Sequence, residues 1–184
     1  GCLGNIGFLL NCSTTEYFMW LADDDEISDN YIETLYKILE NNPDAITAMG
    51  SWKKMKNEYE GNVVKQPNYS SPFLLIRIFN HTLGFQNDSA FYGLHRRKII
   101  QDAKFEGFLP PNNKVISNYC YLILFDILMR GKILFSENCF WISHSYSEKS
   151  YTFSKGLTIF GKLKILIRRF NLYFLYCLKV YKFN

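Results

Sequence analysis

The sequence lacks the features that mark secreted, zinc-stabilised or repetitive proteins. Its five cysteines are odd in number and scattered, with no Cys-x-x-Cys pair and no histidine at a metal-binding spacing. This excludes a regular disulfide framework and favours a reduced, cytosolic setting. No charged-then-apolar leader precedes the first apolar segment, so no secretory signal is expected. No internal repeat is present. The cysteines are Cys2, Cys12, Cys120, Cys139 and Cys177.

The composition suits one folded domain with an appendage. The chain has 184 residues, 48% of them hydrophobic and 17% aromatic, which is enough to bury a core and too apolar for a disordered protein. Residues 155–184 carry seven basic side chains and no acidic one, whereas residues 1–154 carry 14 basic and 17 acidic ones. We therefore divide the chain into a mildly acidic body, residues 1–154, and a basic tail, residues 155–184.

Residues 17–50 have the pattern of a strand, a helix and a second strand. Residues 17–22 form a continuous apolar run, which is typical of a strand covered on both faces. The stretch "SDNYIETLYKILENNP" then places its apolar residues at helical spacing, with Ser28 as the expected N-cap and Pro43 as the stop. Residues 45–50 are again short and apolar. The segment predicts a βαβ unit of a mainly parallel sheet.

The rest of the body alternates polar stretches with apolar runs. Residues 51–90 are rich in turn signals around one apolar run, "FLLIRIF", and predict a long, partly mobile excursion. The stretch "LHRRKIIQDA" predicts a short helix and "FEGFLPPNN" a loop. The stretch "VISNYCYLILFDILMR" predicts a buried helix that ends at Gly131, and "KILFSE" predicts a strand.

Three consecutive aspartates, Asp23, Asp24 and Asp25, follow the first predicted strand. Ligands in open α/β sheets bind at the carboxyl ends of the strands, which is where this turn falls. Adjacent carboxylates repel one another unless a cation compensates them, and such oxygen ligands suit Mg²⁺ or Mn²⁺. Alternatively, the acidic residues form the solvated N-terminal cluster of the next helix, stabilised by its dipole.

Several segments resemble a known enzyme family. The stretch "NIGFLLNCSTTEYFMWLADDDEISDNYIETLYKILENNPDAITAMGS" resembles the central segment of family 2 glycosyltransferases of the GT-A fold. There, an Asn-x-Gly stretch and a helix lead to a strand that ends in an Asp-x-Asp type motif. The stretch "SAFYGLHRRKIIQDAKFEGF" resembles the family's acceptor-side segment, and "FDILMRGKILFSENCFWISHS" is similar to its closing segment. The resemblance covers about residues 1–150 in order.

The resemblance implies an α/β GT-A fold, Rossmann-like, with a mainly parallel sheet and helices on both faces. The family normally places its acidic motif well after a first βαβ unit that holds the nucleotide base, yet here the motif lies near the start. We therefore expect a fold that is incomplete at its N-terminus and a chain that is inactive alone.

The resemblance also implies a metal site. A divalent ion, Mg²⁺ or Mn²⁺, would be held by Asp23, Asp24 and Asp25, and Asp24 is central whichever way the motif is aligned. His144 resembles the late histidine that some members use near the metal or the diphosphate. Its alternative is the structural role that a histidine after a strand commonly has.

A catalytic base is harder to place. The family's base usually comes from a Glu-Asp pair about three helical turns before the glycine that matches Gly131, which here falls on Tyr119 and Cys120. Neither side chain can act as that base. Asp88 and Glu106 are the substitutes that we predict, and Asp126 is a third candidate; each has a surface or capping role as its alternative.

Two arginines and three tryptophans complete the candidates. Arg96 and Arg97, with Asp23, would meet the donor diphosphate or an anionic acceptor through paired hydrogen bonds, although adjacent arginines at a helix start commonly form a solvated face. Trp20 is expected in the core, Trp52 is a candidate for stacking on a sugar, and Trp141 is left open.

These observations predict a metal-dependent glycosyltransferase that moves a sugar from a nucleotide-diphosphate sugar to an acceptor hydroxyl. The expected acceptor is a saccharide or a lipid-linked one, in bacterial surface polysaccharide or lipopolysaccharide synthesis, and no nucleic acid is involved. The alternative is a non-catalytic remnant or membrane-associated interaction module of the same fold. A different Mg²⁺-dependent phosphate enzyme would share the acidic turn but has no reason to share the later segments.

The basic tail adds a prediction about location. Its apolar runs are too short for a bilayer span of about twenty residues. Interleaved lysines, arginines and large apolar residues are instead typical of an amphipathic helix that lies on an anionic membrane surface. We expect a cytoplasmic protein, peripheral on the inner face of the cell membrane. The alternative is a closing helix packed on the domain with its lysines in water.

Overall fold

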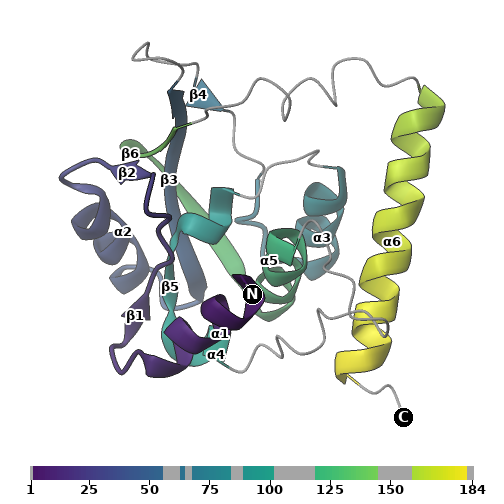
Figure 1. Ribbon diagram of the computed structural model, residues 1–184, viewed down its shortest axis with the longest axis horizontal. Helices are drawn as coiled ribbons and strands as arrows, with labels where there is room; N and C mark the ends of the chain where they lie inside the picture. Colours follow the sequence, from purple (N-terminus) through teal and green to yellow (C-terminus); the bar gives the residue numbers. More distant parts are fainter. Residues whose placement is uncertain are drawn as a thin grey trace.

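The protein folds as an α/β structure around one sheet (Figure 1). The computed structural model describes residues 2–55, 63–64, 68–83, 89–101, 119–144 and 159–181. The strands follow the order β1-β5-β3-β6-β2, and β4 pairs with β3 off this path. They are β1 (Tyr17–Phe18), β2 (Glu26–Ile27), β3 (Ala45–Met55), β4 (Val63–Val64), β5 (Leu94–Arg96) and β6 (Lys132–His144).

The sheet is parallel at its centre and antiparallel at its margins. The long strands β3 and β6 pair in parallel, whereas the four pairings of the short strands are antiparallel. The GT-A-like α/β class is therefore confirmed, with a more mixed sheet than the sequence predicted. Apolar periodicity reports burial, and it does not report the direction of two- or three-residue strands that join a sheet at its margins.

The predicted βαβ unit is present. Strands β1 and β3 both run antiparallel to β5, so they are parallel to each other, and the helix α2 (Tyr31–Glu40) joins them. The first strand is shorter than residues 17–22, because Phe18, opposite His95, is its last residue with a partner in β5. A 3-10 helix, η1 (Ser89–Tyr92), lies just before β5. Beyond Phe18, Trp20 is buried without belonging to a strand.

The helix α2 does not use the predicted N-cap. Asn30 occupies the N-cap position, and its side chain makes no capping hydrogen bond. The Ser28 hydroxyl instead accepts a hydrogen bond from the backbone N–H of Phe140 in β6 at 3.0 Å, and the Ser28 N–H donates to the Phe140 carbonyl at 2.9 Å. The local pattern assigned the Ser28 hydroxyl to the helix, whereas in the structure this hydroxyl is hydrogen-bonded to Phe140, which is distant in the sequence.

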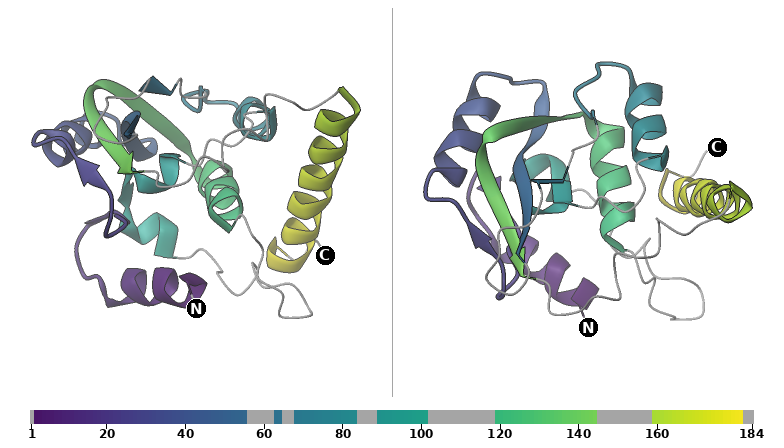
Figure 2. Two further views of the ribbon diagram at one scale, coloured as in Figure 1. Left: turned by 45° about the horizontal axis from the view of Figure 1, so that its top comes forward. Right: turned by 90° about the horizontal axis from the view of Figure 1, so that it is seen from above.

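Helices cover both faces of the sheet, as Figure 2 shows from two sides. On one face, α2 buries Leu35 and Leu39 against Trp52, Cys139 and other residues of the strands. On the other face, a larger core forms between the sheet and a layer of helices. These helices are α1 (Cys2–Cys12), α3 (Leu74–Leu83), α4 (Arg97–Gln101) and α5 (Tyr119–Arg130).

The central helix of that layer, α5, was predicted from its apolar sequence. It ends at Arg130, directly before Gly131. All eight residues from 121 to 128 are buried, including Asp126, whose carboxylate accepts a hydrogen bond from Arg130 Nε at 2.8 Å. The predicted strand that follows is also present, and it extends to His144 as β6.

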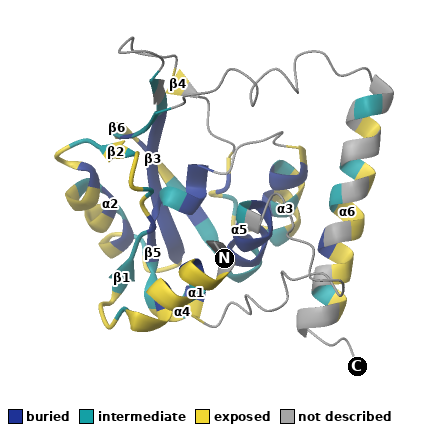
Figure 3. Ribbon diagram, viewed as in Figure 1, coloured by how far each residue is buried: buried dark blue, intermediate teal, exposed yellow. Residues whose placement is uncertain are grey.

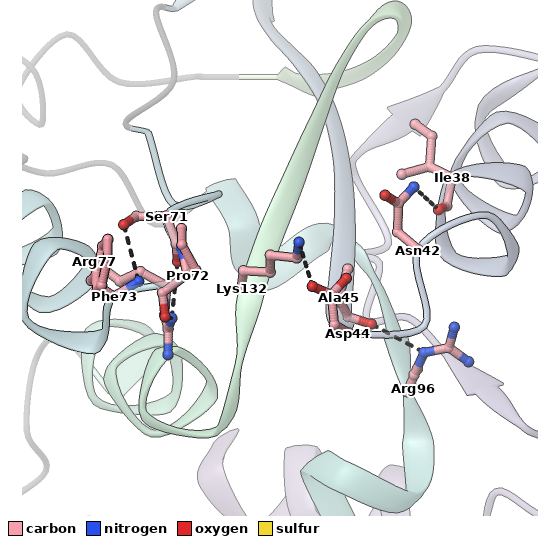
Figure 4. A network of polar contacts seen from close by, with 10 residues as sticks. All are labelled: Ile38, Asn42, Asp44, Ala45, Ser71, Pro72, Phe73, Arg77, Arg96 and Lys132. Atoms are coloured by element: carbon pink, nitrogen blue, oxygen red, sulfur yellow. Dashed lines mark hydrogen bonds and ion pairs between the residues drawn. The ribbon is translucent and has the colours of Figure 1, made fainter.

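The run "FLLIRIF" is part of a helix, so residues 51–90 are more regular than the predicted excursion. Strand β3 extends through Met55, and α3 packs on α5 through Arg77. The buried Arg77 guanidinium donates two hydrogen bonds to the Leu128 carbonyl at 3.1 and 3.0 Å, and further bonds to the carbonyls of Ser71 and Pro72 at 2.9 and 3.0 Å (Figure 4). Arg77 thus occupies a carbonyl near the C-terminus of α5, where helices leave acceptors free.

The basic tail forms a helix, α6 (Ile159–Tyr181), that packs beside α3 and α5 (Figure 1). Its Tyr173 is buried and stacks on Phe125 of α5, with ring centroids 4.3 Å apart. Other large apolar side chains of α6 are exposed, and Figure 3 shows exposed positions recurring along this helix. None of the helices in the described part of the chain is long and apolar enough to cross a membrane.

Candidate active site at the acidic turn

The acidic turn lies beyond the carboxyl end of β1, beside the carboxyl end of β6. The Asp25 N–H donates to the Ala22 carbonyl at 3.3 Å, which closes the turn. The chain then enters β2, where Glu26 pairs with Ile142 of β6. Asp23 and Asp24, between these two attachments, are exposed. The turn therefore holds two carboxylates in solvent between two fixed points of the backbone.

Asp25 differs from its neighbours because it is partly buried against β6. Its Oδ2 accepts a hydrogen bond from Trp141 Nε1 at 3.0 Å. Burial raises the pKa of the Asp25 carboxyl, and the nearby Asp24 charge raises it as well, whereas the hydrogen bond from Trp141 and interactions with His144 lower it. Burial, the adjacent Asp24 and two residues of β6 that are distant in the sequence thus determine how readily this carboxylate ionises.

His144 reaches the same place from the end of β6. Its Nε2 lies 3.0 Å from Oε1 of Glu26, and its backbone interacts with Asp25. The Glu26 side chain is well exposed and the imidazole only partly so. The structure therefore brings His144 to Asp25, as the predicted metal set required, and adds Glu26, which the sequence analysis did not select.

A layer of stacked aromatic rings lies next to the acidic turn and contacts Asp25 through Trp141. The Trp141 indole stacks on Tyr92, with ring centroids 4.2 Å apart, and on Trp52 at 5.4 Å. Trp52 Nε1 donates to the Ser143 hydroxyl at 2.7 Å. Trp52 is buried in this layer, which places it in the core rather than in a position to stack on a sugar. Trp20 is in the core as expected.

The donor chemistry of the turn fits a hard divalent ion that is shared with a substrate. Within the described ranges, no three His, Cys, Asp or Glu side chains are grouped closely enough to hold a metal by themselves. Mg²⁺ commonly takes only one or two carboxylates and completes its coordination with water and substrate phosphates. Asp23 and Asp24 supply that number of exposed carboxylates. The structure does not assemble a closed cage of all four predicted ligands.

The two arginines lie at the other edge of the sheet. Arg96 pairs with Tyr17 at the beginning of β1, whereas the acidic turn follows the end of that strand. Its guanidinium donates to the Ala45 carbonyl at 3.0 Å (Figure 4), to the Leu39 carbonyl at 2.7 Å and to the Tyr17 hydroxyl at 2.9 Å. It therefore satisfies free carbonyls at the C-terminus of α2 and the start of β3.

Arg97 is held at the same edge. Its Nε donates to the Thr15 carbonyl, and its Nη1 donates to Gln101 at 2.8 Å. The structure does not bring Arg96 or Arg97 to the acidic turn. The adjacent arginines were selected because of their charge, whereas backbone acceptors of neighbouring elements determine where they lie.

The two predicted catalytic bases, Asp88 and Glu106, lie outside the described residues. Asp126 is fully buried and paired with Arg130, so it has no access to an acceptor hydroxyl. Of the two positions that match the family's Glu-Asp pair, Tyr119 begins α5 and Cys120 is half-buried within it.

The sequence signals for the missed residues were weak but present. Glu26 extends the acidic run by one position. Trp141 and Ser143 share one face of β6 by the two-residue period of a strand, and this is the face that meets Asp25 and Trp52. Nothing in the local sequence around Tyr92 indicates that its ring stacks on Trp141.

Comparison with known proteins supplies the class. No curated protein sequence matches the chain significantly. The model of the family described as glycosyl transferase family 2 matches residues 1–104, which is more than half of the 184-residue chain and includes α1, α2, the acidic turn, β3 and β5. The resemblance inferred from the sequence is thereby confirmed, and the chain belongs to glycosyl transferase family 2.

Proposed function

We propose that this glycosyltransferase moves a sugar from a nucleotide-diphosphate sugar to the hydroxyl of a saccharide or lipid-linked acceptor, with the donor diphosphate bound at the acidic turn. The observation that carries the proposal is the placement of Asp23 and Asp24. Both carboxylates are exposed, lie beyond the carboxyl end of β1, and fall inside the segment that matches the family. Ligands of α/β sheets bind at this position.

Asp23 and Asp24 would hold Mg²⁺ or Mn²⁺, and the bound ion would neutralise the charge that develops on the leaving diphosphate. Asp25 and His144 were predicted as further ligands. Asp25 already accepts a hydrogen bond from Trp141, and His144 Nε2 is close to Glu26. In the proposal these two residues orient the turn, and they become direct ligands only if those contacts open.

Asp88 and Glu106 remain the predicted bases for deprotonating the acceptor hydroxyl. A non-catalytic interaction module of the same fold is the second candidate. The specific observation in its favour is that α5 begins with Tyr119 and Cys120, where the resemblance leads us to expect the Glu-Asp pair.

We place the enzyme in bacterial surface polysaccharide or lipopolysaccharide synthesis, on the inner face of the cell membrane. The division into a catalytic body, residues 1–154, and a basic tail, residues 155–184, belongs to this proposal. Support comes from α6, where apolar side chains such as Phe174 are exposed in a segment without acidic residues. A lipid-linked acceptor would give such attachment a purpose, since enzyme and acceptor would share one surface.

The test is transfer from a panel of nucleotide-diphosphate sugars by the full-length protein in the presence of Mn²⁺ or Mg²⁺. Asp24→Asn should reduce metal-dependent transfer at least about a hundredfold while leaving the unfolding transition unchanged, because the exposed side chain contributes charge and no packing. Asp29→Asn, at another exposed position near the start of α2, is the matched control and should retain activity. Chelator-insensitive transfer that is equal in Asp24→Asn and the parent would contradict the metal role. Absence of transfer from every donor would favour the interaction module.

A further inference from the structure

Helix α3 exposes an apolar stripe that the proposed function does not use. Leu75 is 80% exposed and Phe79 is 57% exposed, although both lie on a helix that is otherwise packed on α5 through Arg77 and His81. Side chains of this size in solvent on one face of a helix are typical of an interaction surface. The exposed members are Leu75, Ile76, Phe79 and Leu83, and Phe73, directly before the helix, is exposed as well.

Helix α6 exposes a second apolar stripe of the same kind. Phe174 is 64% exposed, while Tyr173, the preceding residue, is buried between Phe125 and His81. Neighbouring residues of α6 thus face the core and the solvent. The exposed members are Leu163, Ile167, Phe170, Phe174, Leu175 and Leu178, and most recur at the three- and four-residue spacing of one helix face.

The two helices contact each other directly, so the two stripes are neighbours. Arg169 Nη1 donates to the Thr82 carbonyl of α3 at 3.0 Å, and the same guanidinium lies 4.7 Å from the Tyr121 ring centroid of α5.

Figures 1 and 2 show how α6 lies against two helices of the body. Helix α3 runs antiparallel to α5, because His81 contacts the Tyr121 carbonyl and Arg77 contacts that of Leu128. Helix α6 crosses both at a steep angle, and its Arg169 and Tyr173 meet Tyr121 and Phe125 of α5. The C-terminal end of α3 therefore meets the middle of α6, and the two stripes extend from this contact along adjoining helices.

The charge of the two helices identifies the partner of the stripes. Neither helix contains an acidic residue, and α6 carries Lys162, Lys164, Arg168, Arg169 and Lys179. A second copy of the chain would bring like-charged helices together, which is unfavourable. An anionic bilayer surface instead attracts the cations and accepts large apolar side chains at the level of its headgroups.

We infer that α3 and α6 together form one docking surface for an anionic lipid membrane, and that α3 contributes apolar contact that the basic tail alone does not supply. This inference rests on the peripheral attachment proposed above and extends it to a helix of the catalytic body. The surface requires no donor sugar, metal or acceptor, so its test does not depend on the proposed reaction.

The experiment is co-sedimentation of the full chain with vesicles of phosphatidylcholine alone or with roughly one-third phosphatidylglycerol, at low and high salt. The parent should bind the anionic vesicles and lose binding as salt rises. Leu75→Gln/Phe79→Gln on α3 and Phe170→Gln/Phe174→Gln on α6 should each lower the partition coefficient by about tenfold or more, because each removes two exposed apolar side chains.

The matched control is Phe8→Gln/Ile32→Gln, which removes similar exposed side chains from α1 and α2, away from this surface, and should bind like the parent. Circular dichroism and urea unfolding confirm that each variant is folded. If the α3 variant binds like the parent while the α6 variant does not, the inference is overturned and tail attachment stands. If both bind like the parent, both ideas fail. A concentration-dependent dimer that the α3 and α6 variants abolish would make the surface a contact between copies and overturn the inference.

Discussion

Two buried histidines should make the fold sensitive to mild acid. His81 and His95 are fully buried, and burial lowers the pKa of each imidazole from 6.5 to about 4. His81 lies 3.0 Å from the Tyr121 carbonyl, and His95 lies 3.0 Å from the Phe91 carbonyl and 2.8 Å from the Thr47 hydroxyl. Each ring is therefore neutral in the folded protein across the range in which it becomes charged in the unfolded chain.

The sign follows from proton linkage. Between pH 6.5 and about 4 the unfolded chain binds more protons at these sites than the folded protein does, so the free energy of unfolding falls as the pH falls. From about pH 7.5 to about pH 5, each histidine should lower the free energy of unfolding by roughly 2 kcal/mol, and the pair should lower it by roughly 4 kcal/mol. This is a large part of the about 5–15 kcal/mol that stabilises a typical domain.

The assay is urea unfolding followed by tryptophan fluorescence at both pH values. His81→Gln and His95→Gln remove the titrating group and keep an amide donor for the carbonyl that each ring faces. If the parent loses about 4 kcal/mol between the two pH values, the double variant should lose far less. Equal pH dependence in the parent and the double variant would refute the reasoning, whatever the absolute stabilities. Loss of α6 packing should accompany the acid transition, since Tyr173 stacks on His81.

Three further predictions concern the site and its support. Trp141→Phe keeps the stacked ring and removes the hydrogen bond to Asp25, so metal-dependent transfer should fall about tenfold in a turnover assay with little change in unfolding. Asp25→Asn should raise the free energy of unfolding at neutral pH. Burial raises the pKa of the Asp25 carboxyl, so its contribution to stability is lost as the pH rises through the pKa in the folded protein, and the ionised group is unfavourable at pH 7. A variant less stable than the parent at pH 7 would contradict this. Gly50→Ala should cost about 2–3 kcal/mol in urea unfolding, because a Cβ there would lie 2.5 Å from Tyr31 Cε2 and 2.7 Å from the Cys139 carbonyl oxygen.

The sequence predicted the elements whose burial is local and periodic. Helix α2, strand β3 and helix α5 follow from apolar spacing, and the position of the acidic turn follows from the strand before it. Ser28 was misassigned because Phe140, which is 112 positions away, takes its hydroxyl. No local pattern reports such a partner.

Other features were missed for different physical reasons. Helix α3 was not predicted because its buried face carries Arg77, His81 and Thr82 while large apolar side chains are exposed, so the usual contrast between a buried apolar face and an exposed polar face is reversed. The support of Asp25 by Trp141 joins residues 116 positions apart. The contacts of Arg96 were not predicted, because the carbonyls to which it donates become neighbours only after α2 and β3 have formed.

The way the acidic turn is fastened affects the entropy of ligand binding. Asp23 and Asp24 stand between the Ala22–Asp25 hydrogen bond and strand β2, and β2 is in turn held on β6 by its pairing and by the two hydrogen bonds of Ser28. Folding has therefore already restricted the backbone that carries both carboxylates, so in the proposed site a cation that arrives with a diphosphate would not have to order a mobile loop. Affinity can then be gained from a modest number of contacts, because little conformational freedom is lost at the moment of binding.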